Sequence, residues 1–202
     1  MARNSNPIYH FNLGNRIVAD SEQFYIRGKM LLTYKDKKPV IDDSVFVGTG
    51  AVIIGDVKIG KDTNIWYNSV LRGDVAPIEI GSETNVQDGT VIHTSRFNGP
   101  CIIGDRVTIG HICLLHACNL HNDAFVGMGS ILMDKVVVES FGFVAANSLV
   151  TPGKIVKSNE LWAGSPAKFL RNISEHELFL IKDTPPHYIS LANFHKKSEV
   201  CI

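Results

Sequence analysis

A six-residue period runs through most of the 202-residue chain and constrains its fold more than any other feature. An aliphatic residue stands at every sixth position, and a small residue often follows four places later, as at Ala51, Thr63 and Cys113. A fixed short period means that one structural unit is repeated, and aliphatic and small inward positions predict a β-helix of stacked hexads. The aliphatic positions are Ile41, Val47, Ile53, Ile59, Ile65, Leu71, Ile80, Val86, Ile92, Ile103, Ile109, Leu115, Leu120, Val126, Leu132, Val138, Val144 and Val150.

The repeat changes its spacing at three places, between 71 and 80, between 92 and 103, and between 115 and 120. We interpret the first two as small loops between hexads. With three hexads to a coil, each hexad forms one side of a triangular prism. We expect this β-helix over 24–170, after an N-terminal arm (1–23) and before a C-terminal helical tail (171–202).

The tail carries two helix signals. Ser174 and Glu177 match a capping box, which predicts a helix that continues through about Lys182. The pair Pro185-Pro186 is expected to interrupt it, because proline lacks the backbone donor and clashes with the preceding turn. A second helix is predicted over about 187–198, where apolar side chains recur every third residue. We expect the tail to pack back on the prism or on a neighbouring chain.

Composition and charge describe one soluble domain with no charged macromolecule as partner. The chain is 45% hydrophobic and has 20 basic and 20 acidic residues, which gives no reason to expect nucleic acid or an anionic membrane. No apolar run approaches the ~20 residues of a transmembrane helix. The first residues lack a secretory apolar segment, and the 4 cysteines show no CxxC spacing. These features predict a cytoplasmic protein without disulfides or a membrane partner.

Three histidines fall at informative positions of the repeat. His93 directly follows the inward Ile92, and His116 directly follows Leu115, three hexads later. The two therefore share a column on one side of the prism, one coil of ~4.8 Å apart, where two imidazoles can hold one metal ion. His111 belongs to the neighbouring side. One chain cannot easily bring all three together, whereas two chains packed side against side can.

The register thus predicts an oligomer with a three-histidine site at each interface, and a homotrimer is the natural cyclic closure. Arg72 lies one coil from His93 in the same column, and Asp88 lies one coil from His111. Arg72 and Asp88 should meet across that interface as an ion pair that fixes the register of two subunits. Further polar groups around the metal would come from Gln87 and Asp74.

Several segments, taken with the repeats, resemble the γ-class carbonic anhydrases and their bacterial relatives over about 24–170. They are Arg72-Gly73-Asp74, Asn85-Val86-Gln87-Asp88-Gly89, His93 and His111-x4-His116. Acyltransferases also use the hexad, whereas this combined polar set is specific. The resemblance implies a left-handed parallel β-helix, an exception to the usual right-handed crossover, and a homotrimer.

The same resemblance implies a metal site and its surroundings. Zn²⁺, or Fe²⁺ in some members, would be held by His93 and His116 of one subunit and His111 of the next. Arg72 and Asp88 match an intersubunit ion pair. The remaining implied active-site residues are Asp74 and Gln87, with Asn85 beside them and Tyr188 as a tail tyrosine that approaches the site.

The implied reaction is the reversible hydration of carbon dioxide to bicarbonate. Three neutral imidazoles and an open position are the catalytic arrangement of zinc, which lowers the pKa of bound water to ~7. The hydroxide would attack carbon dioxide while Gln87 and Asp74 orient the reacting groups. Two departures favour slow turnover: Val75 stands where active members carry a glutamate, and the loop 94–100 has no carboxylate to relay protons.

Two other functions stay open. The first is an acyl- or acetyltransferase, or an acyl-CoA thioesterase, on the same scaffold. A CoA site would need a long groove between coils with basic residues, and hexad transferases typically use one histidine as a general base. The second is a non-catalytic trimer, in which the metal and the Arg72–Asp88 pair only hold subunits together, and metal-dependent assembly would favour it.

Overall fold

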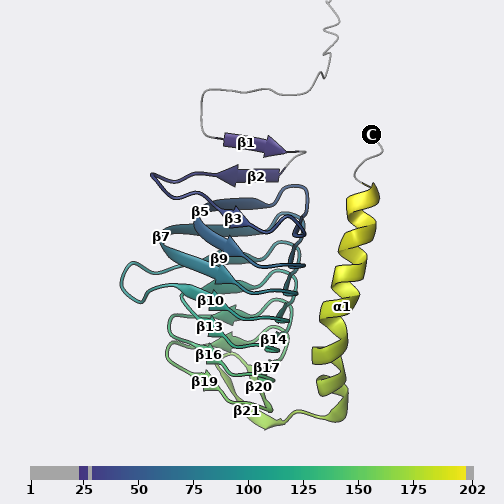
Figure 1. Ribbon diagram of the computed structural model, residues 1–202. Coiled ribbons are helices and arrows are strands. Elements are labelled where there is room, and N and C mark those ends of the chain that lie inside the picture. The colour runs from purple at the N-terminus through teal and green to yellow at the C-terminus, as the bar shows by residue number, and fades with distance from the viewer. Residues whose placement is uncertain (1–22, 27–28, 199–202) are drawn as a thin grey trace, which may run out of the picture.

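The hexads coil into a parallel β-helix whose turns stack along one axis, with an α-helix alongside (Figure 1). The computed structural model describes residues 23–26 and 29–198. The predicted arm (1–23) therefore lies, apart from Gln23, outside the described residues. Among these residues the strands fall on three faces of a prism, as the hexad period predicted.

Face 1 holds β9 (Val91–His93), β12 (Leu114–His116), β15 (Ile131–Leu132) and β18 (Leu149–Val150). Face 2 holds β3 (Val40–Ile41), β10 (Cys101–Ile103), β13 (Asn119–Leu120), β16 (Val137–Val138) and β19 (Ile155–Val156). Two longer strands, β5 (Val52–Ile59) and β7 (Val70–Ile80), run from face 1 onto face 2 and join both into a 13-stranded sheet.

Face 3 is an eight-stranded sheet that stacks one strand from each successive coil and ends in an antiparallel pair. The strands are β4 (Phe46–Val47), β6 (Asn64–Ile65), β8 (Asn85–Val86), β11 (Thr108–Ile109), β14 (Phe125–Val126), β17 (Phe143–Val144), β20 (Glu160–Gly164) and β21 (Ala167–Asn172). An antiparallel pair stands at each end of the solenoid. These pairs are β1 (Gln23–Ile26) with β2 (Lys29–Leu32), and β20 with β21.

The core is built from the aliphatic positions of the repeat. Ile92, Leu115 and Leu132 are fully buried and lie in register on successive coils, as the period predicted. The small inward positions are buried too, and their hydroxyls link the coils: Thr84 Oγ1 donates to the carbonyl of Gly104 at 2.8 Å. Apolar burial of this kind contributes about 25 cal/mol per Å², so the column stabilises every coil it passes through.

One of the two predicted loops is wrong. The segment 71–80 lies inside the continuous strand β7, not in a loop. Its extra residues form a bulge against β5, where the register jumps from Gly55↔Gly73 to Val57↔Ile78. Because β7 turns the corner of the prism while paired with strands on both sides, a bulge keeps most of its backbone hydrogen bonds, which a loop would lose. The segment 94–100 does form a loop, between β9 and β10.

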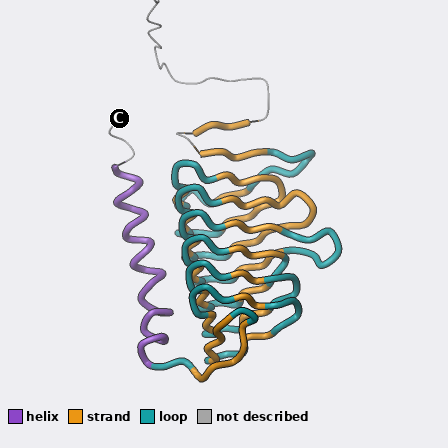
Figure 2. Tube along the Cα trace, turned by 180° about the vertical axis from the view of Figure 1, so that it is seen from behind, coloured by secondary structure: helices purple, strands orange, loops and turns teal. Residues whose placement is uncertain are grey.

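The tail is one helix, α1 (Glu175–Ser198), that runs along face 3 against β4, β6, β8 and β11 (Figure 2). The predicted interruption at Pro185-Pro186 is wrong, because the helix continues through both prolines. Ile181, Pro185 and Ala192 are buried along one stripe of the helix. Packing along that stripe outweighs the roughly 3 kcal/mol that an interior proline costs a helix.

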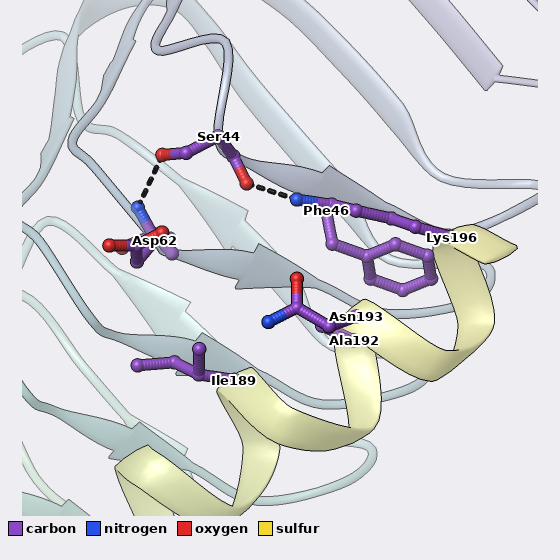
Figure 3. Close-up of a pocket in the computed structure, with 8 residues that line it drawn as sticks. Ser44, Phe46, Asp62, Ile189, Ala192, Asn193 and Lys196 are labelled. Atoms are coloured by element: carbon purple, nitrogen blue, oxygen red, sulfur yellow. Dashed lines mark hydrogen bonds between the residues drawn. The ribbon is translucent and has the colours of Figure 1, made fainter.

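Both ends of α1 are anchored. Ser174 and Glu177 form the predicted capping box, in which the backbone N–H of Ser174 donates to Glu177 Oε2 at 2.6 Å. At the other end Lys196 Nζ donates to the backbone carbonyl of Ser44 (Figure 3). The hydroxyl of Ser44 in turn accepts a hydrogen bond from the backbone N–H of Asp62 at 2.7 Å. The small pocket there is lined by residues that anchor the helix, and none of them is a predicted site residue. Within the described part of the chain, no helix is both long and apolar enough to cross a bilayer.

Candidate metal site

Two of the three histidines lie side by side at the edge where face 1 turns into face 2. His93 ends β9 and His116 ends β12, and the two are direct partners in the parallel ladder. Their ring centroids are 5.2 Å apart. Arg72 pairs with His93 one coil earlier, so the predicted column of Arg72, His93 and His116 is confirmed.

Carboxylates flank this histidine pair from both directions along the prism axis. Asp74, from the coil before, accepts a hydrogen bond from His93 Nε2 at 2.9 Å. Asp134, from the coil after, accepts one from His116 Nδ1 at 3.0 Å. Because an ionised carboxylate can only accept, these contacts place the proton of each imidazole on the nitrogen that faces the aspartate. We call the group of Arg72, Asp74, His93 and His116 the His93 half-site.

The two carboxylates that hold this histidine pair, Asp74 and Asp134, stay ionised. Burial opposes the charge of Asp74, but hydrogen bonds from His93 and Arg72 outweigh it and lower the pKa of Asp74 below its ordinary value. Burial likewise opposes the charge of Asp134, and hydrogen bonds from Asn98 and His116 lower its pKa in turn. The half-site therefore offers negative charge on both sides of the two imidazoles.

The third histidine lies at a different edge, in the turn between face 3 and face 1. His111 Nδ1 donates to Asp88 Oδ2 at 2.8 Å, and Asp88 occupies the same turn one coil earlier. The next residue, Ile112, is exposed and has a φ of +58°, a conformation that strains a β-branched residue. The equivalent corners of the other coils use glycine or asparagine (Gly50, Asn68, Gly89, Gly129 and Asn147).

A buried row of amides leads from this corner along face 3, beneath α1. Gln87 Nε2 donates to Asn85 Oδ1 at 3.0 Å, and Asn85 Nδ2 donates to Thr108 Oγ1 at 2.9 Å. The side-chain oxygen of Gln87, Oε1, has no hydrogen-bond partner among the described residues. We call Asn85, Gln87, Asp88, His111 and Tyr188 the His111 half-site.

Tyr188 joins this half-site from α1. Its ring packs edge-on against Trp66, with centroids 5.3 Å apart. Burial raises the pKa of Tyr188, and the negative charge of Asp88 raises it further. The hydroxyl therefore stays protonated at neutral pH and within electrostatic reach of the corner that carries His111.

The two half-sites do not meet within one chain, since they occupy opposite edges of face 1. No three His, Cys, Asp or Glu side chains of the described residues converge closely enough to bind a metal ion. Arg72 bonds to Asp74 instead of Asp88. Between the half-sites, face 1 presents a column of outward apolar side chains, Val91, Leu114 and Ile131, which are 37%, 39% and 38% exposed.

The donor set fits a metal ion bound by histidine. Each of the three imidazoles has one ring nitrogen on a carboxylate, and its other nitrogen has no hydrogen-bond partner among the described residues. Metal-binding histidines almost always donate their second ring N–H to a carboxylate or carbonyl, which fixes the ring and its tautomer. The free nitrogens are thus the ones able to bind Zn²⁺.

Two residues of the His93 half-site's surroundings, Asp134 and Asn98, did not emerge from the sequence. Asp134 stands two places after the inward Leu132, one coil beyond His116, and this register was a usable signal. Asn98 belongs to the loop 94–100, whose sequence does not show where its side chains reach.

The fold and the histidine half-sites define a hexapeptide-repeat β-helix protein, and comparison with known proteins agrees. Residues 38–73 match the family model described as bacterial transferase hexapeptide (six repeats). The chain also resembles the crystal structure of a hexapeptide transferase family protein from Anaplasma phagocytophilum, with a TM-score of 0.79 and 53% identity. That match covers 83% of this chain and 98% of the other.

Two curated relatives name the family within this class. One is γ-carbonic anhydrase 2, mitochondrial, from Arabidopsis thaliana, with 46% identity over 86% of this chain and 64% of the relative. The other is a carbonic anhydrase from Geobacillus kaustophilus, with 41% identity over 83% of this chain and 91% of the relative. The chain belongs to the γ-carbonic anhydrase family. It spans slightly less than two thirds of the length of the plant relative.

Proposed function

We propose that this protein is a metal-dependent carbonic anhydrase that hydrates carbon dioxide reversibly at sites shared between the subunits of a homotrimer. His93 and His116 of one subunit and His111 of the next hold the metal. One observation carries the proposal: each of the three imidazoles is hydrogen-bonded to a carboxylate through one ring nitrogen, and the other ring nitrogen has no partner in the described part of the chain. The γ-carbonic anhydrase relatives support the reaction.

The placement of the half-sites supports the trimer. Since they occupy opposite edges of face 1, a neighbour that covers this face brings its His111 half-site to the His93 half-site of the first chain. The apolar column of Val91, Leu114 and Ile131 supplies a surface for such a contact. In the assembled trimer Arg72 turns from Asp74 to Asp88 of the neighbouring subunit, which keeps the imidazole of His111 on its Oδ2.

Zn²⁺ is the metal we propose, with Fe²⁺ as the alternative. When bound by three neutral imidazoles, it supplies a water of pKa about 7 and so a nucleophile at neutral pH. Gln87 is buried, and its side-chain Oε1 has no partner in the described part of the chain, so it can orient the reacting molecule by hydrogen bonding. Asp74 accepts from His93 and holds negative charge near the site, while Asn85 fixes the amide of Gln87. Tyr188 remains a proton donor at neutral pH because its pKa is raised.

Proton export limits this enzyme. Val75 is 49% exposed at the position where a carboxylate would relay protons, and the loop 94–100 carries no acidic residue. Protons therefore leave with external buffer, and turnover is slow. We place the protein in the cytoplasm, since the three cysteines of the described residues are buried free thiols. The Arabidopsis relatives are named mitochondrial, so cell fractionation decides between the two compartments.

Stopped-flow measurement of carbon dioxide hydration tests the proposal, on protein of known zinc or iron content and with His111→Ala as the blank. We expect metal-dependent hydration in the wild-type protein and none above buffer in the blank. No hydration by a fully metallated trimer would contradict it. Turnover of an acyl-CoA substrate by that trimer would then support the transferase or thioesterase reading, and metal-dependent assembly without any activity would support a structural metal.

A further inference from the structure

We propose that Asp134 and Asn98 are positioning residues of the metal site, which tie the loop 94–100 to the imidazole of His116. The inference rests on the proposed function, because it concerns the same metal. Neither residue belongs to the polar set that carries the family resemblance. Both are assigned from their contacts in this structure.

Asp134 is held on every side. Its Oδ2 accepts from His116 Nδ1 at 3.0 Å, and its Oδ1 accepts from Asn98 Nδ2 at 3.0 Å. The backbone carbonyl of Asp134 accepts from the N–H of Gly153 at 3.0 Å. Because both carboxylate oxygens and the main chain of Asp134 are hydrogen-bonded, the aspartate has one orientation. Its hydrogen bond to Nδ1 then fixes the orientation of the His116 ring.

Asn98 is fixed by its own loop. Ser95 and Gly99 exchange backbone hydrogen bonds of 3.0 Å, which close the loop at its base. The hydroxyl of Ser95 also accepts from the backbone N–H of Asn98 at 3.1 Å. The loop begins just after His93 and delivers Asn98 to Asp134, so it connects the end of one ligand strand to the anchor of the other ligand.

The arrangement gives the two histidines of one column equivalent support from opposite directions. Asp74 holds His93 from the coil before, and Asp134 holds His116 from the coil after. The hydrogen bond on Nδ1 of His116 leaves Nε2 as the nitrogen that can bind the metal. This geometry gives a role to the insertion between positions 92 and 103 of the repeat. The insertion carries Asn98, whose side chain holds Asp134 and so completes the anchor of His116.

Metal affinity tests the assignment. We would measure zinc and cobalt dissociation constants of the trimer by chelator competition, and record the visible spectrum of the cobalt form. Removal of a group that orients a metal-binding histidine typically weakens metal affinity by about 10- to 100-fold. We expect a loss of that size and an altered cobalt spectrum in Asp134→Ala. Asp134→Asn keeps an accepting oxygen and should lose less, and Asn98→Ala should lose least.

Asp123 provides the matched control. It accepts two hydrogen bonds from Arg106, at 2.8 and 2.9 Å, and its side chain is 18% exposed against 21% for Asp134. It lies in the turn between face 2 and face 3, away from both half-sites. Asp123→Ala should lower the midpoint of thermal unfolding and leave metal affinity and the cobalt spectrum unchanged.

The outcomes separate the inference from the function on which it rests. Wild-type protein that binds metal no better than His111→Ala would overturn the proposed metal site itself. If the wild type binds metal and Asp134→Ala binds it within twofold, Asp134 has no positioning role. An equal loss of affinity in Asp123→Ala would show a general effect of removing a carboxylate, and would also overturn the assignment. Should Asp134→Ala fail to assemble, Asp134→Asn gives the answer by the same comparison.

Discussion

At the scale of single residues, the chain repeats one pairing three times: an imidazole held by an aspartate. His93 with Asp74, His116 with Asp134 and His111 with Asp88 lie at 2.8 to 3.0 Å. The histidines and two of the three aspartates were predicted from the hexad register, because a regular repeat fixes which residues share a column. Asp134 was missed, although the register places it one coil beyond His116, because the contact also depends on the path of the turn after β15 and on the side-chain rotamer.

Val75 carries a prediction at this scale. Replacing it by glutamate places a carboxylate on an exposed site one residue from Asp74, where it can pass protons to solvent. We expect Val75→Glu to raise kcat several-fold at low buffer concentration and to change it little at high buffer, where external base already carries the proton. Stopped-flow rates over a series of imidazole buffer concentrations give the measurement. Val75→Gln, which has similar size and no charge, is the control, and an equal gain in both variants would refute a proton-relay role.

At the scale of elements, local sequence rules predicted the helices and strands well where the hexad repeats, and less well where tertiary packing determines the bounds of an element. The capping box at Ser174 gave the start of α1 correctly. The rule that proline ends a helix failed at Pro185-Pro186, because a buried stripe continues across both residues. The spacing 71–80 was interpreted as a loop, whereas pairing with strands on either side keeps β7 continuous. In both cases tertiary contacts, absent from the local sequence, outweighed the local signal.

The cap of α1 gives a pH-dependent prediction. A hydrogen bond from Arg171, with others from Ser174, lowers the pKa of Glu177 from 4.5 to about 2. A lowered pKa means that the folded state favours the charged form, so the stabilisation is complete above pH 4.5 and fades as pH falls toward 2. Because Arg171 is half exposed, we expect Glu177→Gln to cost about 1 kcal/mol or less at pH 7.

Hydrogen exchange in the first turn of α1 measures this effect at pH 7 and at decreasing pH. Protection should fall in Glu177→Gln at pH 7, and its difference from wild type should shrink below pH 4.5. Glu175→Gln is the matched control, because it removes the same charge from the same turn without touching the capping box. Equal loss in both variants would attribute the effect to the helix dipole instead.

At the scale of the whole molecule, the prism holds apart the two half-sites whose histidines must bind the same metal ion. The triangular coil places the His93 half-site and the His111 half-site at opposite edges of face 1, and no movement of single side chains joins them. Apolar side chains on the same face favour its burial by a second chain. The sequence predicted this division, because the columns of His93 and His111 differ by one side of the prism.

The measurement that tests this account most directly mixes His93→Ala chains with His111→Ala chains and counts bound metal in the reassembled trimers. Either variant alone has no complete site. In a cyclic trimer each mixed assembly regains one site, so a random equal mixture should bind about one quarter of the wild-type metal. Mixed trimers, demonstrated by mass spectrometry, that bind no metal would contradict a site shared between subunits.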